Sequence, residues 1–248
     1  MATKSTVKGR IAQVGITFAA AGMFLLIRPD WLQVVEAHYT KVSSPGSIQQ
    51  YLDSTKVRKL QLGAGANNLK GWLNTDIIPS GDQVFLDATE RFPLPDASFQ
   101  FVFAEHVVEH ITYEQAVGML QECRRVMAPG AKIRLVTPNL ERFLSLFNEN
   151  KTQEQTKYMA EKTKWHEWPT TSDQATYILN MQLREWGHMF VYTPKMLIAA
   201  FEKAGFRDVR EFSEGVSGSD GFTATDAREG SPIAGINRYE AMAIEGTR

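Results

Sequence analysis

The sequence predicts an α/β fold built on a mostly parallel sheet. From Lys56 to Arg248, short apolar runs alternate with segments of helical periodicity, the pattern of successive βαβ units. The first apolar run leads directly into the turn Gly63-Ala64-Gly65, and polar side chains follow the next three runs. Because the carboxyl ends of strands in open α/β sheets border the ligand crevice, the same observations predict where a site lies.

Seven apolar runs are the expected strands. They are Arg58–Leu62, Leu73–Ile77, Gln83–Leu86, Phe99–Ala104, Lys132–Thr137, Asp208–Phe212 and Tyr239–Glu245. Helical periodicity predicts helices over Tyr113–Met127 and Pro194–Ala204, the second ending at Gly205, which suits a helix C-terminus. Only ten residues separate the first two strands, which is short for a parallel crossover, so we expect a single helical turn there.

Residues 139–190 differ from the segments on either side. They are polar and helix-prone, with aromatic residues gathered in WHEWP and REWGHMFVY. We interpret them as an insertion between the fifth strand and the last helix. Two interpretations stay open, a lid over an active site and a subdomain that only packs on the surface. As a lid, the segment would recognise the acceptor through its aromatic residues Trp165, Trp168, Trp186, Tyr177 and Tyr192.

Residues 1–45 are expected to form an appendage to a main domain of residues 46–248. Lys4, Lys8 and Arg10 precede the run from Ile11 to Ile27, which carries no charge. Its seventeen residues are at the lower limit for a membrane-spanning helix. We favour a membrane anchor, with a helix buried in the globular fold as the alternative. The expected location is the cytoplasm or a membrane that residues 11–27 contact.

Composition excludes several classes of protein. The formal net charge is −1, so no overall field recruits nucleic acid, and we expect no nucleic-acid partner. The single cysteine, Cys123, excludes an internal disulfide and a cysteine-rich zinc site. It lies in MLQECRRVM, an apparent amphipathic helix, where a small core residue is the favoured interpretation.

Polar groups end the second, third and fourth expected strands. Asp76 ends the second strand, where an acid in dinucleotide-binding folds accepts hydrogen bonds from a ribose diol. Asp87 follows the third strand, and Glu105 and His106 follow the fourth. Each acid also suits the N-cap of a following helix, and for Asp87 that alternative is serious.

These stretches resemble a known family. KLQLGAG, NTDI, LDAT, FPLPDASFQFVFAEHVVEHI and ECRRVMAPGAKIRLVTPN look like successive motifs of class I S-adenosylmethionine-dependent methyltransferases. The resemblance is strongest to predicted methyltransferases of bacterial cell-envelope and polysaccharide gene clusters, and WGHMFVYTPKMLIAAFEKAGF extends it. It implies a Rossmann-like sheet with an antiparallel last strand, helices on both faces and a helical insertion. The implied cofactor is S-adenosyl-L-methionine.

The resemblance assigns cofactor contacts at the first two strand ends. Gly63, Ala64 and Gly65 would pass beneath the methionine and ribose portions of the cofactor. Asp76 would hold the ribose hydroxyls, with Ile77 beside it.

The next two strand ends complete the implied cofactor site. Asp87 would face the adenine amino group, with Ala88 beside the ring. Glu105 and His106 would line the pocket near the methionine end.

Histidines are the candidates for catalysis. Transfer to an oxygen acceptor needs a base, and a histidine with an ordinary pKa suits that task. The candidates are His188 and His110, with His106 third. His106 and His110 are four residues apart in EHVVEH, but no third ligand is evident, so the sequence predicts no metal site.

The leading hypothesis is an enzyme that methylates a small-molecule or glycan acceptor, on oxygen. One alternative is a non-catalytic cofactor-binding module or inactive partner subunit, favoured by Gln61 and Asn67 where the family pattern has an acid and a third glycine. Another is a dinucleotide-dependent oxidoreductase, which the missing full Gly-x-Gly-x-x-Gly and the acids after the third and fourth strands disfavour.

Overall fold

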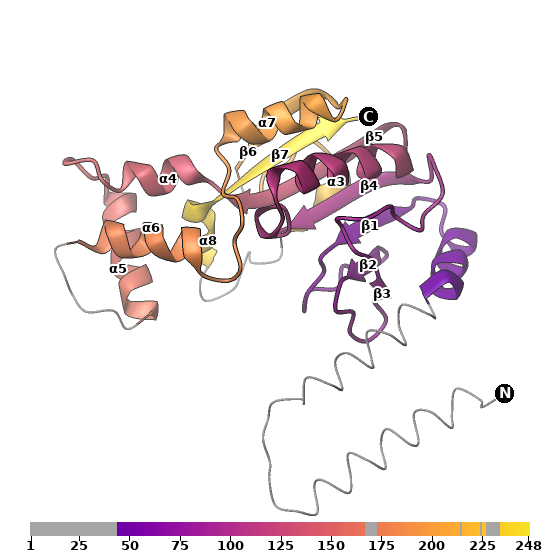
Figure 1. Cartoon of the computed structure of the whole chain (residues 1–248), viewed down its shortest axis with the longest axis horizontal. Coiled ribbons are helices and arrows are strands. Elements are labelled where there is room, and N and C mark those ends of the chain that lie inside the picture. The colour runs from indigo at the N-terminus through magenta and orange to yellow at the C-terminus, as the bar shows by residue number, and fades with distance from the viewer. Residues whose placement is uncertain (1–43, 167–172, 214, 224, 227–233) are drawn as a thin grey trace, which may run out of the picture.

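The computed structural model describes residues 44–166, 173–213, 215–223, 225–226 and 234–248 (Figure 1). The predicted anchor at residues 11–27 lies outside these ranges. Among the residues that the structure describes, none belongs to a helix that is both long and apolar enough to cross a membrane.

A seven-stranded sheet in the order β3-β2-β1-β4-β5-β7-β6 forms the centre of the molecule. The strands are β1 (Lys59–Leu62), β2 (Leu73–Asp76), β3 (Val84–Phe85), β4 (Phe99–Glu105), β5 (Met127–Pro138), β6 (Arg207–Phe212) and β7 (Ala241–Thr247). β1 to β5 pair in parallel, whereas β7 runs antiparallel to both β5 and β6. The predicted mostly parallel sheet with an antiparallel last strand is therefore confirmed.

Three helices cover one face of this sheet. They are a helix over residues 44–54, α3 (Tyr113–Val126) and α7 (Pro194–Lys203). α3 starts at a capping box, because Thr112 and Gln115 each bond the other's backbone N–H. Gly205 follows Ala204, the C-cap of α7, with φ +91°, a left-handed conformation that ends a helix at little cost with glycine. Figure 1 shows α3 and α7 on the same side of β5 and β7.

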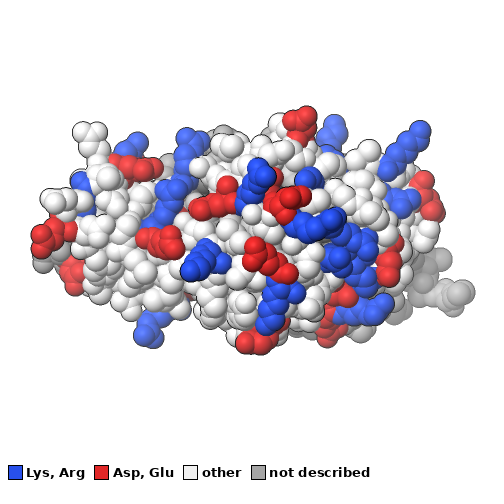
Figure 2. Space-filling model, turned by 90° about the horizontal axis from the view of Figure 1, so that it is seen from above, with Lys and Arg blue, Asp and Glu red and all other residues white. Residues whose placement is uncertain are grey.

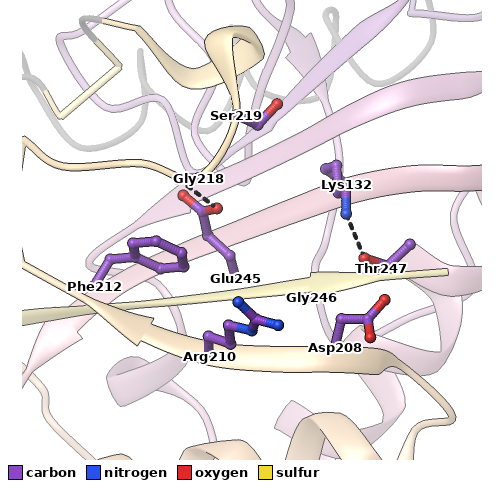
Figure 3. Close-up of a pocket in the computed structure, with 9 residues that line it drawn as sticks. All are labelled: Lys132, Asp208, Arg210, Phe212, Gly218, Ser219, Glu245, Gly246 and Thr247. Atoms are coloured by element: carbon purple, nitrogen blue, oxygen red, sulfur yellow. Dashed lines mark hydrogen bonds between the residues drawn. The ribbon is translucent and has the colours of Figure 1, made fainter.

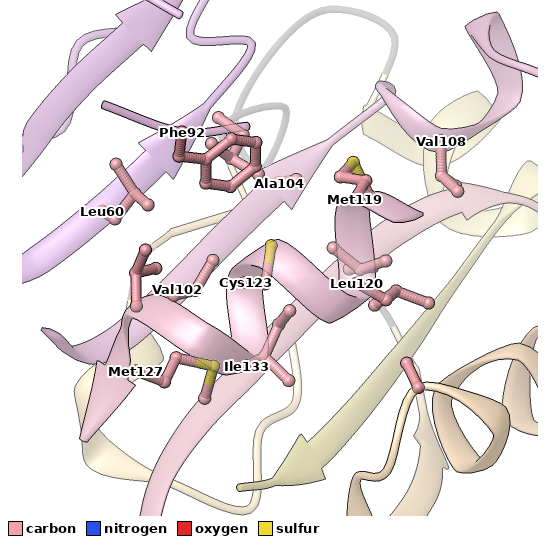
Figure 4. Close-up of a cluster of buried hydrophobic side chains, with 14 of the residues drawn as sticks. Leu60, Phe92, Val102, Ala104, Val108, Met119, Leu120, Cys123, Met127 and Ile133 are labelled. Carbon is pink, nitrogen blue, oxygen red and sulfur yellow. The ribbon is translucent and has the colours of Figure 1, made fainter. Parts of the chain in front are cut away.

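Apolar side chains pack between these helices and the sheet (Figure 4). Leu60, Val102 and Ile133 point from neighbouring strands toward Leu120 and Cys123 of α3, and all five are fully buried. Burial raises the pKa of the Cys123 thiol far above its usual value, so this cysteine is a core residue and not a nucleophile.

The opposite face of the sheet is covered by the segment after β6, which contains the 3₁₀ helix η2 (Asp220–Phe222). Phe222 packs on Trp72 and, edge to face, on Phe101 of β4. Arg134 is 1% exposed there and donates to Asp226 at 2.5 and 2.9 Å and to Glu245 at 2.8 Å. This ion-pair network fixes residue 226 against β5 and β7.

A helical bundle with its own core extends from the end of the sheet (Figure 1). Its helices are α4 (Leu140–Ser145), α5 (Gln153–Trp165), α6 (Gln174–Arg184) and α8 (Ala234–Glu240). Phe143, Tyr158, Ile178 and Tyr239 are buried in it. The first three helices fall within residues 139–190, but α8 comes from far along the chain and occupies the start of the strand predicted at Tyr239.

The crossover between β1 and β2 differs from the prediction. Residues 63–72 contain turns and no helix, so the expected helical turn was wrong. The buried Gln61 side chain closes this segment instead, since its amide donates to Asn67 O at 2.9 Å and accepts from Leu69 N–H at 3.2 Å. One side chain thus satisfies two backbone groups that a helical turn would have paired internally.

Candidate functional site

The turn after β1 contains two glycines in left-handed conformations. Gly63 has φ +59° and Gly65 has φ +53°. A Cβ on Gly63 would lie 2.3 Å from Val107 Cγ2, so this glycine is required by packing within the protein. A Cβ on Gly65 would meet no atom within 4 Å, which leaves an open cradle above the turn that a ligand can approach.

Asp76 fixes that turn from the neighbouring strand. Gly65 N–H donates to Asp76 Oδ2 and Ile78 N–H donates to Oδ1, each at 2.8 Å. An ionised carboxylate has about four acceptor positions, so two remain for a ribose diol. Ile77 and Ile78 are 54% and 59% exposed beside it and present an apolar surface on which a flat ring could pack. This arrangement fits the cofactor that the sequence predicts.

Gln61 and Asn67 were the residues that favoured a non-catalytic module. The structure gives Gln61 a separate task, because its amide both donates and accepts in closing the turn. A carboxylate at position 61 could accept but not donate. The amide is therefore explained by the local backbone and does not indicate a lost function.

Asp87 and Ala88 lie just beyond β3, half-buried at the same edge of the sheet. Thr89 donates to Asp87 Oδ1 from both its N–H, at 2.8 Å, and its hydroxyl, at 2.7 Å. Leu86 N–H donates to Asp76 O at 3.1 Å and joins the ends of β2 and β3. The Asp87 side chain thus closes a local turn, and no helix follows it before β4, so the structure does not show the N-cap of the alternative interpretation.

Four side chains beyond the end of β4 form what we call the histidine cluster: His106, Glu109, His110 and His188. His106 follows Glu105, the last residue of β4, and has φ +53°. This rare conformation turns the chain into the 3₁₀ helix η1 (Val108–His110). The motif FAEHVVEH therefore delivers three of the four members within one short turn.

His188 reaches the cluster because the chain from α6 docks on Glu109. Met189 and Phe190 N–H donate to the Glu109 backbone oxygen at 2.8 and 3.2 Å. The His110 and His188 rings then lie edge to face, with centroids 4.9 Å apart and planes at 76°. The structure thus brings together the two histidines that the sequence proposed for catalysis.

Glu109 is the member that sequence reasoning passed over. It is fully buried, with His106 Nδ1 at 2.7 Å from Oε1 and the Thr137 hydroxyl donating to Oε2 at 2.9 Å. Burial alone raises the pKa of Glu109, but the hydrogen bond and charge of His106, together with His110, outweigh it and lower the pKa below its usual value. The sequence did contain evidence for this contact, since EHVVEH places His106 and Glu109 three residues apart, a spacing that lets the two side chains meet within one turn.

The tautomer of His188 follows from its neighbour. Nδ1 lies 2.7 Å from the backbone oxygen of Gln182, and a carbonyl only accepts, so Nδ1 carries the proton. Nε2 of the neutral ring is then free to accept a proton. Burial lowers the pKa of His188, although the bond to Gln182 opposes this, and the ring is therefore neutral at physiological pH.

Aromatic residues of the insertion differ in what they can contact. Trp186 is 50% exposed and its ring centroid lies 5.6 Å from that of His188, so it can stack on an acceptor. Tyr177 is 44% exposed. Tyr192 is fully buried against Phe190, so the prediction that it contributes to a recognition surface was wrong. The side chains of Trp165 and Trp168 lie outside the described residues.

A pocket of about 370 Å³ lies elsewhere, over β5, β6 and β7 (Figure 3). Lys132 and Thr247, which are hydrogen-bonded at 2.6 Å, and the side chains of Arg210 and Glu245 contribute to its lining. It contains none of the predicted site residues. On the face shown in Figure 2, the described basic and acidic side chains mingle, as expected from the net charge.

Comparison with known families identifies the central segment. Residues 68–135, from the β1–β2 crossover into β5, match the model of a methyltransferase domain. The match supports an S-adenosylmethionine-dependent methyltransferase. It includes Asp76, Asp87 and three members of the histidine cluster, whereas the turn after β1 and His188 lie outside it. No curated protein matches the chain.

Several solved structures are similar in outline. A SAM-dependent methyltransferase from Archaeoglobus fulgidus is 19% identical, with a TM-score of 0.46 over 88% of this chain and 94% of that one. A possible histamine N-methyltransferase from Thermotoga maritima is 15% identical, with the same TM-score and coverages. A methyltransferase from Mesorhizobium loti is 13% identical, with a TM-score of 0.45 over 83% and 97% of the two chains. Likenesses of this strength carry no inference about the acceptor.

Proposed function

We propose that the protein transfers the methyl group of S-adenosyl-L-methionine to an oxygen of a small-molecule or glycan acceptor. The observation that carries the proposal is the contact between the cofactor turn and the histidine cluster. Gly63 packs directly on Val107, which lies in the chain between His106 and Glu109. The open cradle at Gly65 and the cluster therefore belong to one edge of the sheet.

The sulfonium of the cofactor is already activated, so the protein's task is to hold the acceptor in line at about 3–3.5 Å. The acceptor oxygen attacks the methyl carbon while the carbon–sulfur bond breaks, and the bonding pair returns to sulfur. The acceptor proton leaves to the histidine cluster. His188 suits this task because its neutral ring offers Nε2 and its pKa is lowered by burial.

Acceptor recognition is assigned to the helical insertion and its return segment. Trp186 is exposed beside His188 and offers a flat face of the kind that packs on sugar rings. The glycan class itself rests on the resemblance of the sequence motifs to methyltransferases of polysaccharide gene clusters.

Two measurements test the proposal in sequence. In a thermal-shift panel, S-adenosylmethionine and S-adenosylhomocysteine should raise the melting temperature, and NAD should not. Labelled-methyl transfer into a cell extract should then give a labelled product with an acid- and base-stable ether-type methyl. Cofactor binding without any transfer would favour the non-catalytic module, and stabilisation by NAD alone would favour the oxidoreductase.

Membrane association is a separate proposal that rests on the uncharged run at residues 11–27. A chain that begins at Ser44 retains the bond from Phe85 N–H to the Ser44 hydroxyl, at 2.8 Å, and the core residues Ile48 and Leu52. It should bind cofactor and leave the membrane fraction. An unfolded product would favour the buried-helix alternative.

A further inference from the structure

The histidine cluster contains residue types that can bind a metal ion as well as residue types that can act as a general base. Glu109, His110 and His188 each offer a ligand atom, and these atoms all lie within 4.8 Å of one another. We propose that these three residues bind a divalent transition-metal ion of the zinc class. The inference deepens the proposed function, since the ion would act at the acceptor side of the same site.

The ligand set suits such an ion. Two imidazoles and one carboxylate are ligands that zinc and its neighbours accept, and three protein ligands leave a coordination position open for an acceptor oxygen. With metal–ligand distances of about 2.0–2.2 Å, the ligand atoms of a tetrahedral ion are about 3.3–3.6 Å apart. The three ligand atoms, which now lie within 4.8 Å of one another, therefore need to draw together by at most about 1.5 Å. The edge-to-face arrangement of His110 and His188 keeps the two rings from stacking and lets both reach one point.

The surrounding contacts orient the ligands in the way that metal sites require. His188 uses Nδ1 on the Gln182 carbonyl, which leaves Nε2 for an ion. Glu109 is held by Thr137 on one oxygen and His106 on the other, and each oxygen retains a further lone pair. Metal-binding histidines and carboxylates characteristically have such outer partners.

The backbone brings the ligands together without help from an ion. Met189 and Phe190 N–H bind the Glu109 carbonyl, so the segment carrying His188 is fixed to the segment carrying His110. Gly187 has φ +76°, and a Cβ there would lie 4.0 Å from His110 Nδ1, so the loop passes close to that ring. The site is therefore largely preformed.

Charge also favours a cation. The Glu109 carboxylate is fully buried, and in the described part of the chain its ion-pair partner is His106. A buried carboxylate is costly unless positive charge compensates it. An ion at this position would also lower the pKa of a bound acceptor hydroxyl. With Nε2 on the ion, His188 would act as a ligand in place of the base, and the acceptor proton would leave to solvent.

Cobalt(II) is a suitable probe because its visible absorption reports nitrogen and oxygen coordination. Untagged full-length protein, stripped with a chelator, is titrated with Co²⁺ and then with competing Zn²⁺, without cofactor or acceptor. We expect one equivalent of Co²⁺ to give a visible absorption band that Zn²⁺ abolishes. His110→Ala, His188→Ala and Glu109→Gln should each weaken binding by more than about 100-fold, beyond the 10–100-fold typical of outer-shell changes.

His166→Ala is the matched control, because this histidine lies outside the cluster, and it should bind as the wild type does. Circular dichroism and melting curves of every variant establish that it is folded. The inference is overturned if the stripped wild type gives no band, or if folded His188→Ala binds Co²⁺ as the wild type does. Full methyl transfer by metal-stripped protein would overturn a role for the ion while leaving the proposed function intact. Metal binding without methyl transfer to any acceptor would contradict the proposed function while leaving the metal site intact.

Discussion

His106 Nδ1 lies 2.7 Å from Oε1 of the fully buried Glu109, three residues further along the chain. Because Glu109 is ionised, its oxygen accepts and the imidazole donates. His106 has φ +53°, a conformation that costs roughly 1–2 kcal/mol for a residue with a side chain. The bond to Glu109 and the bond from His106 N–H to Val136 O, at 2.9 Å, compensate for that cost and fix the turn that presents the cluster.

Gly65 and Gly71 provide a matched test of the cofactor turn. Both have positive φ, +53° and +81°, and neither has an atom within 4 Å of an added Cβ. Alanine at either position should cost about 1 kcal/mol in the free energy of unfolding. Only Gly65→Ala should weaken S-adenosylmethionine binding in calorimetry, because only its Cβ enters the cradle. Equal effects of the two variants on affinity would move the cofactor away from this turn.

Asp76→Ala should weaken the cofactor by roughly 1.5–3 kcal/mol, the scale of a charge-assisted hydrogen bond. Part of that loss comes from the Gly65 N–H, which loses its acceptor. The 2′-deoxy analogue separates the two contributions, because it lacks only the ribose hydroxyl. Wild type should discriminate against it more strongly than the variant does. Asp82→Ala, on an exposed acid of the β2–β3 segment, is the control and should leave discrimination unchanged.

His188→Ala should reduce the turnover rate by roughly 10²–10⁴-fold with little change in cofactor affinity. The reason is that His188 faces His110 and Glu109, whereas the cofactor contacts lie on the turn after β1 and on β2. Single-turnover kinetics with saturating cofactor measure the effect. Parallel loss of affinity and turnover would indicate a structural histidine, and full activity would remove it from the mechanism.

The pH profile of turnover should show the lowered pKa of His188. Protonated imidazole neither accepts a proton nor binds a metal, so activity falls as pH falls through the folded-state pKa. Burial places that pKa below the ordinary value of 6.5, so activity should still exceed half of its maximum at pH 6.5 and fall through its midpoint in more acid buffer. An acid limb centred above pH 6.5 would contradict the assignment.

Arg134→Met should be strongly destabilising because Asp226 and Glu245 remain buried without a counter-charge. We expect a loss of about 3–5 kcal/mol in urea unfolding. Asp96→Ala is the comparison, since its carboxylate is 70% exposed and its ion pair with Arg125 should contribute no more than about 1 kcal/mol. Similar losses in the two variants would show that the buried network adds little to stability.

Much of the fold could be predicted from local patterns. The predicted runs found all seven strands, although β5 begins at Met127, five residues before the predicted start. Central strands such as β4 are largely buried and appear in the sequence as nearly continuous apolar runs. The start of the last strand was misplaced, since Tyr239 packs in the helical bundle and its helix ends only at Glu240. Nothing in the local sequence distinguishes those two environments.

The candidate site was predictable only in part. The strand-end residues follow from parallel topology, which places the carboxyl ends of strands at one edge. The meeting of His188 with His110 and Glu109 depends on two backbone bonds across a long separation in sequence. Spacing within EHVVEH therefore suggested an incomplete metal pair and could not supply the third ligand. Tyr192 was expected to contact the acceptor, but an aromatic residue next to an active-site motif can equally belong to the core.

The position of β7 has a consequence for how the chain acquires this sheet. β7 is the last of the seven strands along the chain, yet it lies between β5 and β6. Pairing β7 with β5 closes a loop of roughly a hundred residues. The chain loses the entropy of that loop before the contacts between β5 and β7 can stabilise it. Until then β5 and β6 both present open edges, which are templates for pairing with other chains. Slow refolding and concentration-dependent aggregation are therefore built into the strand order, and proteolytic loss of the segment after residue 234 would make that vulnerable intermediate permanent.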